Sequence, residues 1–348
     1  MLAQDPLRIV AIGGGTGLST LLNGLKRHVY LPGRPGAPDV AGAAPLVDLT
    51  AVVTVTDDGG SSGRLRRDLD VLPPGDIRNC MVALSEDEAL LSRLFQYRFP
   101  AGRGLKGHTF GNLFLAAMTH LTGDFPHAVR LAAEVLATRG RILASSDGHV
   151  TLEARLEDGS TVAGETKISK SRSRIASISL HPRPCRPLKE TLEAIARADL
   201  ITLGPGSLYT SVIPNLLVDQ IPQAIRRSPA LKAYFVNLMW QPGETMRFTA
   251  ADHVEAIYRH GGTGLLDCVV VNTHPVGRPL RRRYAEQSAR PVENDIERLA
   301  QLRVTVVGRD LLARSDWARH DPEAAATVAI ELARAGRRRR VKLLREAR

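Results

Sequence analysis

The chain has 348 residues, 43% of them hydrophobic, which is enough for one large α/β domain or for a domain with a subdomain. It contains no apolar run of about 18 residues and no secretory leader pattern, so we expect a cytoplasmic protein without a membrane span. Cys80, Cys185 and Cys268 lie far apart and form no CxxC pair, which indicates reduced thiols.

The positive charge is concentrated at one end of the sequence. The net charge is +11, and residues 334–348 hold eight Lys or Arg against one Glu, so this segment carries +7 and the other residues carry +4. This location predicts a basic C-terminal tail at 334–348, outside a single domain at 1–333. Aromatic residues make up 4% of the chain and none lies in the tail, so no specific nucleic-acid partner is expected.

The first predicted elements are a buried strand, a glycine turn and a helix. The strand covers residues 7–12 and the helix covers residues 17–27. The turn between them contains Gly13, Gly14, Gly15 and Gly17. A strand, glycine turn and helix in this order bring backbone N–H groups close to a phosphate.

A second glycine-rich turn follows the next predicted strand. Residues 28–46 are rich in Pro, Gly and Ala and predict a loop, and the β-branched residues 49–58 predict a buried strand. That strand ends in Asp57-Asp58-Gly59-Gly60. Downstream, Asp76 is predicted to be the N-cap of a helix, and helical patterns continue to about residue 99 and over residues 111–121.

The second half of the chain alternates strands with helices around one different segment. Short alternating pieces with turn signals predict a small antiparallel β patch inserted at about 140–185. Further strands are predicted at 200–203, 233–238, 268–273 and 304–310, with a helix at 188–198 before them. The fold class is therefore α/β, a Rossmann-like, mostly parallel sheet with helices on both faces.

The two acidic residues at the end of the second strand have three open interpretations. Asp57 and Asp58 could hold a ribose hydroxyl, bind Mg²⁺ that bridges phosphates, or cap the following turn. The first glycine turn is neither a Walker A loop nor a complete dinucleotide fingerprint. No HExxH, CxxC or EF-hand pattern is present, so no structural metal is predicted.

Two more polar turns are candidates for anion binding. Gly206 and Ser207, in a Gly-Pro-Gly-Ser turn, offer N–H and hydroxyl donors at a predicted helix start. Ser207 does not lie in a GxSxG motif, which argues against a nucleophile. His108, near Asn112, is either a phosphate donor, a general acid or a structural hydrogen-bonding residue, and Asn237 has an amide that suits a base edge.

Long motifs in a fixed order make the chain resemble a known family. They are "AIGGGTGLSTLLNGLK", "AVVTVTDDGGSSGRLR", "LPPGDIRNCMVAL", "GHTFGNLFLAA", "GPGSLYTSVIPNLLV", "VNLMWQPGET" and "RHDPEAAA". Together they resemble the gluconeogenesis factor family, the YvcK-type proteins, which is related to the 2-phospho-L-lactate transferases of cofactor F420 synthesis (CofD-like). The resemblance covers residues 7–333, and Trp240 departs from the small polar residue usual before "QPGET".

The resemblance implies a regulatory protein that binds UDP-N-acetylglucosamine and links carbon metabolism to envelope synthesis and cell shape. It implies an unidentified protein partner in envelope synthesis, no required cofactor and no catalytic residue. The residues implied or considered for the ligand are Gly14, Gly15, Thr16, Asp57, Asp58, His108, Asn112, Gly206, Ser207, Asn237, Glu244, Tyr284 and Arg319. The alternative is a metal-dependent transferase that uses a nucleotide-activated donor, and a homodimer is also left open.

Overall fold

The chain forms two sheets. The computed structural model describes residues 5–29, 47–86, 89–171 and 173–346. The predicted loop at 28–46 lies mostly outside the described residues. The strands are Leu7–Gly13 (β1), Val47–Val53 (β2), Arg141–Ala144 (β3), Thr151–Leu156 (β4), Thr161–Ala163 (β5), Ile175–His181 (β6), Leu200–Leu203 (β7), Leu231–Phe235 (β8), Cys268–Asn272 (β9) and Thr305–Arg309 (β10).

The larger sheet has seven parallel strands in the order β10-β9-β8-β7-β1-β2-β3. From β1 the chain moves outward to β2 and β3, and from β7 it moves outward on the other side to β8, β9 and β10. The order therefore reverses between β1 and β7. In open parallel sheets, the crevice beyond the strand ends at such a reversal is the usual ligand site.

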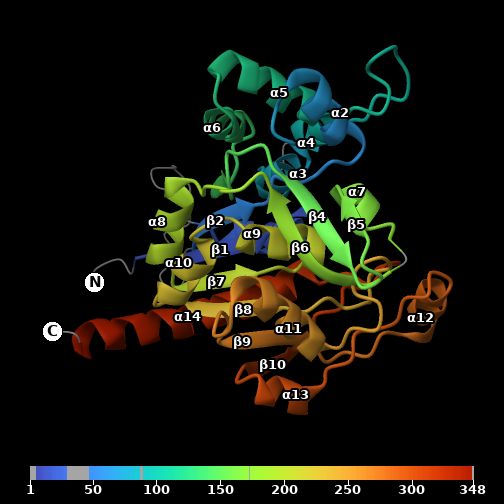
Figure 1. The fold of residues 1–348 in the computed structure, drawn as a ribbon. Coiled ribbons are helices and arrows are strands. Elements are labelled where there is room, and N and C mark those ends of the chain that lie inside the picture. Colours follow the sequence, from blue (N-terminus) through green and yellow to red (C-terminus); the bar gives the residue numbers. More distant parts are fainter. Residues whose placement is uncertain (1–4, 30–46, 87–88, 172, 347–348) are drawn as a thin grey trace.

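Helices cover both faces of this sheet (Figure 1). The helices are Gly15–Leu25 (α1), Gly60–Leu69 (α2), Gly75–Leu84 (α3), Ala89–Gln96 (α4), Phe110–Thr122 (α5), Phe125–Val135 (α6), Glu165–Ile168 (α7), Lys189–Arg197 (α8), Ile213–Leu216 (α9), Ile221–Arg227 (α10), Ala250–Gly261 (α11), Arg278–Ala285 (α12), Ile296–Gln301 (α13) and Pro322–Glu346 (α14). Helix α1 packs against α3 and α14, whereas α8, α9, α10 and α11 form the opposite layer. The α/β fold expected from the sequence is confirmed.

The strand β2 is shorter than the sequence predicts. It was expected to reach Asp58, but it ends at Val53. Its neighbour β1 ends at Gly13 and turns directly into α1, so the residues after Val53 have no strand beside them on that side. The N–H of Thr54 makes the last contact, to the Gly13 carbonyl at 3.1 Å.

The predicted β patch forms, but its first strand belongs elsewhere. Strands β5, β4 and β6 make a three-stranded antiparallel sheet, as expected. Residues 141–144, which the sequence analysis placed in this patch, form β3 and pair in parallel with β2 at the edge of the large sheet. Alternating short segments indicate strands correctly, but they do not determine which sheet each strand joins.

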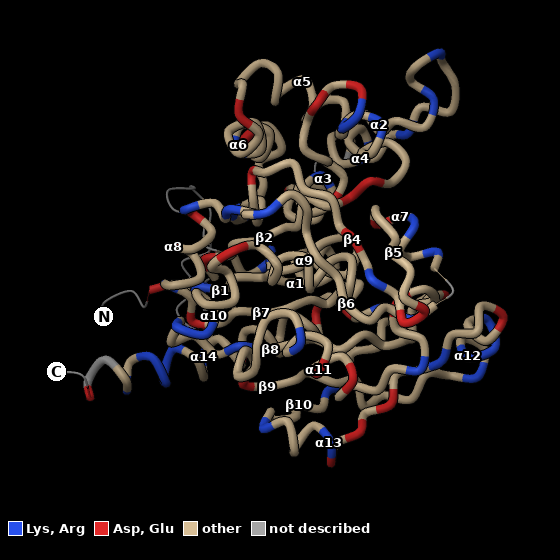
Figure 2. The backbone as a smooth tube through the Cα atoms, viewed as in Figure 1, with Lys and Arg blue, Asp and Glu red and all other residues tan. Residues whose placement is uncertain are grey.

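The basic segment after residue 333 continues the long helix α14 instead of leaving the domain. Helix α14 contacts β1, β7 and β8, and Lys and Arg residues gather towards its C-terminal end (Figure 2). Two of them pair with the same buried carboxylate. The fully buried carboxylate of Asp199 pairs with Arg337 at 2.5 Å and with Arg340 at 2.9 Å. Part of the positive charge thus neutralises a buried carboxylate, which would be costly unpaired.

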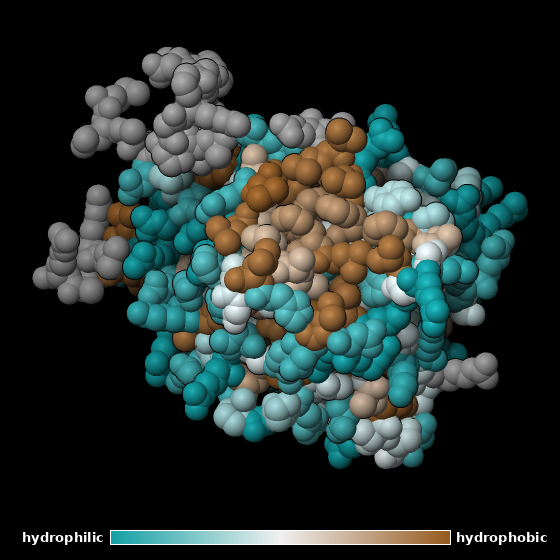
Figure 3. Space-filling view, turned by 90° about the horizontal axis from the view of Figure 1, so that it is seen from above, coloured by the Kyte–Doolittle hydropathy of each residue, from teal (hydrophilic) through white to brown (hydrophobic). Residues whose placement is uncertain are grey.

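Apolar side chains gather on the face of the molecule that Figure 3 shows, above the sheet. The helices at the top of Figure 1 carry exposed apolar side chains, namely Leu90 and Leu94 on α4, Leu121 on α5 and Val135 on α6. Within the described part of the chain, no helix combines the length and the apolar character needed to cross a membrane.

Candidate functional site

The site begins where the first and third glycine turns meet. Gly14 is the N-cap of α1 and has no side chain to cap the helix, and Gly15 has a φ of +62°, which favours glycine. A Cβ on Gly17 would lie 2.6 Å from the Cα of Gly206 and 2.6 Å from the carbonyl oxygen of Pro205. The two turns therefore pack backbone against backbone, and a side chain at Gly17 would separate them.

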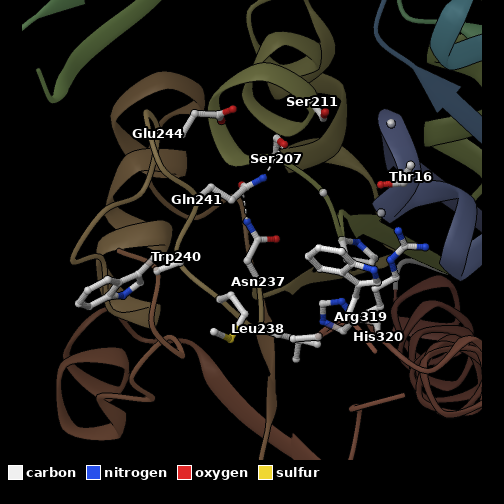
Figure 4. A pocket seen from close by; sticks show the side chains of 18 of the residues that line it. Thr16, Ser207, Ser211, Asn237, Leu238, Trp240, Gln241, Glu244, Arg319 and His320 are labelled. Atoms are coloured by element: carbon white, nitrogen blue, oxygen red, sulfur yellow. Dashed lines mark hydrogen bonds between the residues drawn. The ribbon is translucent and has the colours of Figure 1, made fainter. Parts of the chain in front are cut away.

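A pocket of about 480 Å³ opens at this junction (Figure 4). Its wall combines both glycine turns with the loop after β8 and with the segment before α14. The lining residues are Gly14, Gly15, Thr16, Gly17, Thr20, Ser169, Pro205, Gly206, Ser207, Ser211, Asn237, Leu238, Met239, Trp240, Gln241, Pro242, Glu244, Tyr284, Gln287, Ala289, Trp317, Ala318, Arg319 and His320. The pocket therefore lies at the reversal of strand order between β1 and β7.

A chain of amide and hydroxyl groups crosses the pocket wall. The Asn237 Nδ2 donates to Gln241 Oε1 at 3.0 Å, and Gln241 Nε2 donates to Ser207 Oγ at 2.8 Å (Figure 4). Asn237 follows β8 and Ser207 follows β7, so neighbouring strands position both groups. An amide is not a proton acceptor of useful basicity, so Gln241 cannot activate Ser207 as a nucleophile.

The carboxylate of Glu244 is held by protein donors. It accepts from the N–H of Tyr209 at 3.1 Å, from Thr210 Oγ1 at 3.1 Å and from Ser169 Oγ at 3.3 Å. Burial raises the pKa of Glu244, and these hydrogen bonds oppose the shift. Glu244 thus fixes the helix that follows Ser207 while one side of it faces the pocket.

The opposite side of the pocket carries a free cation beside aromatic rings. Arg319 is exposed. Its backbone carbonyl accepts from the Ala313 N–H at 2.9 Å, whereas its guanidinium makes no hydrogen bond or ion pair with any described residue. Tyr284 and Trp317 meet edge to face, with ring centroids 6.2 Å apart. The neighbouring His320 is buried, which lowers its pKa to about 4, and its Nε2 donates to the Val236 carbonyl at 3.1 Å. Arg319 is therefore the cation of this wall that remains available to a ligand.

Comparisons with known proteins identify the family of the chain. Residues 9–312 match the family model described as 2-phospho-L-lactate transferase CofD. The chain belongs to this family.

Within the CofD family, the chain is similar to proteins named gluconeogenesis factor. It is 46% identical to the one from Bacillus subtilis over 332 residues, covering 95% of this chain and 99% of the relative. It is 46% identical to the one from Halalkalibacterium halodurans over 324 residues, covering 93% of this chain and 95% of the relative. A crystal structure of a Bacillus halodurans protein is 45% identical, with a TM-score of 0.87, and covers 94% of this chain and 100% of that one.

The pocket collects most of the residues that the sequence analysis proposed, and their contact with a ligand stays a prediction. Those that line it are Gly14, Gly15, Thr16, Gly206, Ser207, Asn237, Glu244, Tyr284 and Arg319. Asp57, Asp58, His108 and Asn112 do not line it. Trp240, the departure from the family motif, does line it, and its indole N–H is anchored on the Phe248 carbonyl at 2.9 Å.

The four other residues have partners within the α2 and α7 region. Asp58 accepts from the N–H and Oγ1 of Thr166, at 2.8 and 2.7 Å, and so fixes the start of α7. His108 Nδ1 lies 2.9 Å from Ser61 Oγ, whereas Asn112 Nδ2 donates to a neighbouring serine hydroxyl on α2 at 3.3 Å. These contacts agree with the cap and hydrogen-bonding interpretations that were left open.

Carboxylates with raised pKa values lie next to the pocket. Burial and the charge of Asp57 raise the pKa of Asp76 to about 7. Burial, Asp76 and Asp57 raise the pKa of Glu165 to about 10. The expected N-cap role of Asp76 is wrong, because Pro74 holds that position and Asp76 lies in the first turn of α3 with its carboxyl on the Gly15 N–H.

The acidic region does not by itself form a metal site. Among the described residues, no group of three or more His, Cys, Asp or Glu side chains is arranged to hold a metal ion. Asp57 accepts from the Gly59 N–H at 2.8 Å and so closes its own turn. A Mg²⁺ at this position would have to take most of its ligands from phosphate oxygens and water.

Sequence reasoning missed several pocket residues that come from distant segments. Gln241 and Trp317 lie in loops, and Ser169 follows α7 in the inserted patch. Gln241 stands inside the family motif "VNLMWQPGET", so that motif was a signal for it. Trp317 lies two positions before the first residue of "RHDPEAAA" and has no pattern of its own.

Proposed function

We propose that this protein binds UDP-N-acetylglucosamine in the pocket between β1 and β7 and acts in the cytoplasm as a regulator that links carbon metabolism to envelope synthesis and cell shape. The observation that supports this most is the junction of two glycine turns at the strand-order reversal, next to the start of α1, whose N-cap is a glycine. Backbone N–H groups at such a position favour a diphosphate. The 46% identical relatives are named gluconeogenesis factor, which is consistent with a role in carbon metabolism.

Each part of the pocket has a role in this proposal. The diphosphate would lie between the start of α1 and Arg319, whose planar guanidinium can contact two phosphate oxygens. The Asn237 amide would read the base edge, because Asn has both a donor and an acceptor. The hydroxyl and amide groups around Ser207 would face sugar hydroxyls. A binding role fits Ser207 better than catalysis, since its hydrogen-bond partner is the Gln241 amide.

The second candidate is a metal-dependent transferase, favoured by the match to the CofD family model. Asp76 lies beside the start of α1 and is close enough to Asp57 for the two charges to repel, and a Mg²⁺ bound to ligand phosphates there would relieve this repulsion. The metal would stabilise charge on the transferred group. This candidate requires turnover of a nucleotide, which a regulator does not.

One titration separates the two candidates. Calorimetry with UDP-N-acetylglucosamine, with and without Mg²⁺, would be followed by mass analysis of the recovered ligand. We expect binding of an intact ligand, weakened about 10–100-fold by Arg319→Ala, which removes charge-assisted hydrogen bonds. The control is Arg314→Ala, an exposed arginine of the same loop that does not line the pocket.

Two other results would reject the regulatory proposal. Absence of binding would show that the pocket does not take UDP-N-acetylglucosamine. A ligand recovered cleaved only with Mg²⁺, and intact in Asp57→Asn, would support the transferase instead.

A further inference from the structure

A second cavity adjoins the nucleotide pocket on the side of α1 and α3. It has a volume of about 870 Å³ and shares Thr16, Thr20, Trp317, Arg319 and His320 with the first pocket. Figure 4 shows Thr16 and Arg319 at the same end of the first pocket. We call this second cavity the cationic chamber because lysine and arginine side chains line it.

Four positive side chains line the cationic chamber. They are Lys26, Arg78, Arg98 and Arg319. The described residues that line the cavity include no Asp or Glu. Four cations around one cavity attract an anion, so an anion bound there would be stabilised.

Helix α1 contributes a polar face to the chamber. Ser19, Thr20 and Asn23 line it, together with Lys26 just beyond the helix end. The apolar face of the same helix is buried in the core. The hydroxyls of Ser19 and Thr20 donate to the carbonyls of Gly15 and Thr16, at 3.0 Å each, so their oxygens remain as acceptors. The polar face thus offers acceptors and the Asn23 amide to ligand hydroxyls, while the cations beside it suit the oxygens of a phosphate ester.

Arg78 is the cation with the strongest need for an anion. It is partly buried, and it donates to Thr109 Oγ1 at 2.7 Å and to Asn79 Oδ1 at 2.6 Å. Its Nε is buried and has no hydrogen-bond partner among the described residues. Burial and the nearby charge of Arg98 lower the pKa of Arg78, and Asp57 and Asp76 only partly oppose the shift. The protein therefore desolvates this guanidinium without giving it an ion pair.

The other two cations keep donors free. Lys26 Nζ donates to the Ser85 carbonyl at 3.2 Å, and Arg98 Nη1 donates to the Gly107 carbonyl at 2.6 Å. A lysine ammonium has three donors and an arginine has five, and neither side chain pairs with a carboxylate in the described part of the chain. These hydrogen bonds hold the side chains of Lys26 and Arg98 near the cavity and leave their other N–H groups free to donate to a ligand.

We propose that the cationic chamber binds a small phosphorylated metabolite beside the nucleotide pocket. Lys26, Arg78 and Arg98 contact its phosphate, and the polar face of α1 contacts the rest of the molecule. Arg319 lies on the wall common to both cavities. Lys26, Arg78 and Arg98 line only the second cavity, so this proposal does not depend on which ligand the first pocket binds.

The test uses a phosphorylated probe on the full chain with the first pocket already filled. The protein is saturated with UDP-N-acetylglucosamine, and glycerol 3-phosphate is titrated at low ionic strength, with glycerol as the neutral control. We expect binding of the phosphate ester and none of glycerol. Arg98→Gln and Lys26→Gln should each weaken it about tenfold, since each removes one charged contact.

Arg93→Gln is the matched control, because Arg93 is exposed on α4 and does not line the chamber. It should leave the affinity unchanged. Melting temperatures of the variants check that each one is folded. Unchanged affinity in Arg98→Gln and Lys26→Gln, an equal loss in Arg93→Gln, or no binding at millimolar probe would overturn the inference.

The titration also distinguishes failure of the proposed function from failure of the chamber proposal. If UDP-N-acetylglucosamine does not bind, the same titration is made on the free protein. Probe binding that depends on Arg98 and Lys26 then supports the chamber while the regulatory proposal fails. If UDP-N-acetylglucosamine does bind, a probe that it displaces and that ignores both substitutions lies in the first pocket, which overturns the chamber.

Discussion

Two regions at the same edge of the large sheet have opposite electrostatic character. One lies at the carboxyl ends of β1 and β7, and the other lies beyond the carboxyl end of β2. Between β1 and β7 the chain presents backbone N–H groups, hydroxyls and the unpaired Arg319, and the carboxylate of Glu244 is satisfied by three donors. Beyond β2 it brings together Asp57, Asp76 and Glu165, with raised pKa values for the last two.

We call the region between β1 and β7 the donor half and the region beyond β2 the acidic half. The contrast matters because the carboxyl group of Asp76, which belongs to the acidic half, contacts the donor half. Its carboxyl accepts from the Gly15 N–H, and a Cβ on Gly14 would lie 2.5 Å from Asp76 Oδ2. A phosphate at the start of α1 would therefore approach a carboxyl group. Such a ligand requires a protonated Asp76 or a cation between the two.

The largest expected effect is in the donor half, from Gly17→Ala. The added Cβ meets the Gly206 backbone at 2.6 Å, which no side-chain rotation relieves. We expect a loss of more than about 3 kcal/mol of stability and no detectable binding of UDP-N-acetylglucosamine. Gly13→Ala is the control, since its Cβ would make ordinary contact at 3.5 Å with Leu18 Cβ. Denaturant unfolding and calorimetry measure both, and equal behaviour of the two variants would contradict the packing argument.

An intermediate effect is expected in the acidic half, from Asp76→Asn. The pKa of Asp76 is about 7 in the folded protein and about 4 in the unfolded chain. The folded protein therefore holds this proton more tightly, and its stability falls as the pH rises from about 4 to about 7. The Asn variant removes that charge, so it should be more stable than the wild type by about 1–3 kcal/mol at pH 8. At pH 4.5 the difference should nearly vanish. Unfolding curves at both pH values test this, and a variant destabilised equally at both would show that the carboxyl group has a purely structural role.

The smallest effect is expected from Asp58, which the resemblance implied for the ligand. Its carboxylate holds Thr166 at the start of α7, so Asp58→Ala should cost about 1 kcal/mol. Asp58→Asn keeps an acceptor oxygen and should cost less. Both should bind UDP-N-acetylglucosamine with an affinity within about twofold of wild type. A tenfold loss in the Asn variant would return Asp58 to the binding site.

The sequence predicts the strands and the sheet edge well because both are local patterns. Continuous apolar runs such as Leu200–Leu203 are buried on both faces in a parallel sheet, and polar turns after them must lie at the same edge. That rule brings Gly206 and Asn237 to one pocket. It does not place Asp58 or His108, because the chain after β2 leaves the sheet and turns into the α2 layer.

Other misses depend on contacts between distant segments. The charge run after residue 333 looks like a solvated tail until Asp199 is seen buried beneath Arg337 and Arg340. Trp317 reaches the pocket from a loop with no periodic pattern. The cations of the chamber lie apart in the sequence, at Lys26 and on α3 and after α4, and only the packing of α1 on α3 brings them together.

The packing of α14 has a consequence for the newly synthesised protein. A ribosome that has translated residue 320 has made all seven strands of the large sheet, but not the helix that covers β1, β7 and β8. The buried Asp199 has no Arg337 or Arg340 at that stage. The nascent chain therefore presents an uncovered apolar sheet face and an unpaired carboxylate until the last helix emerges, and this interval is when a chaperone would have a surface to bind.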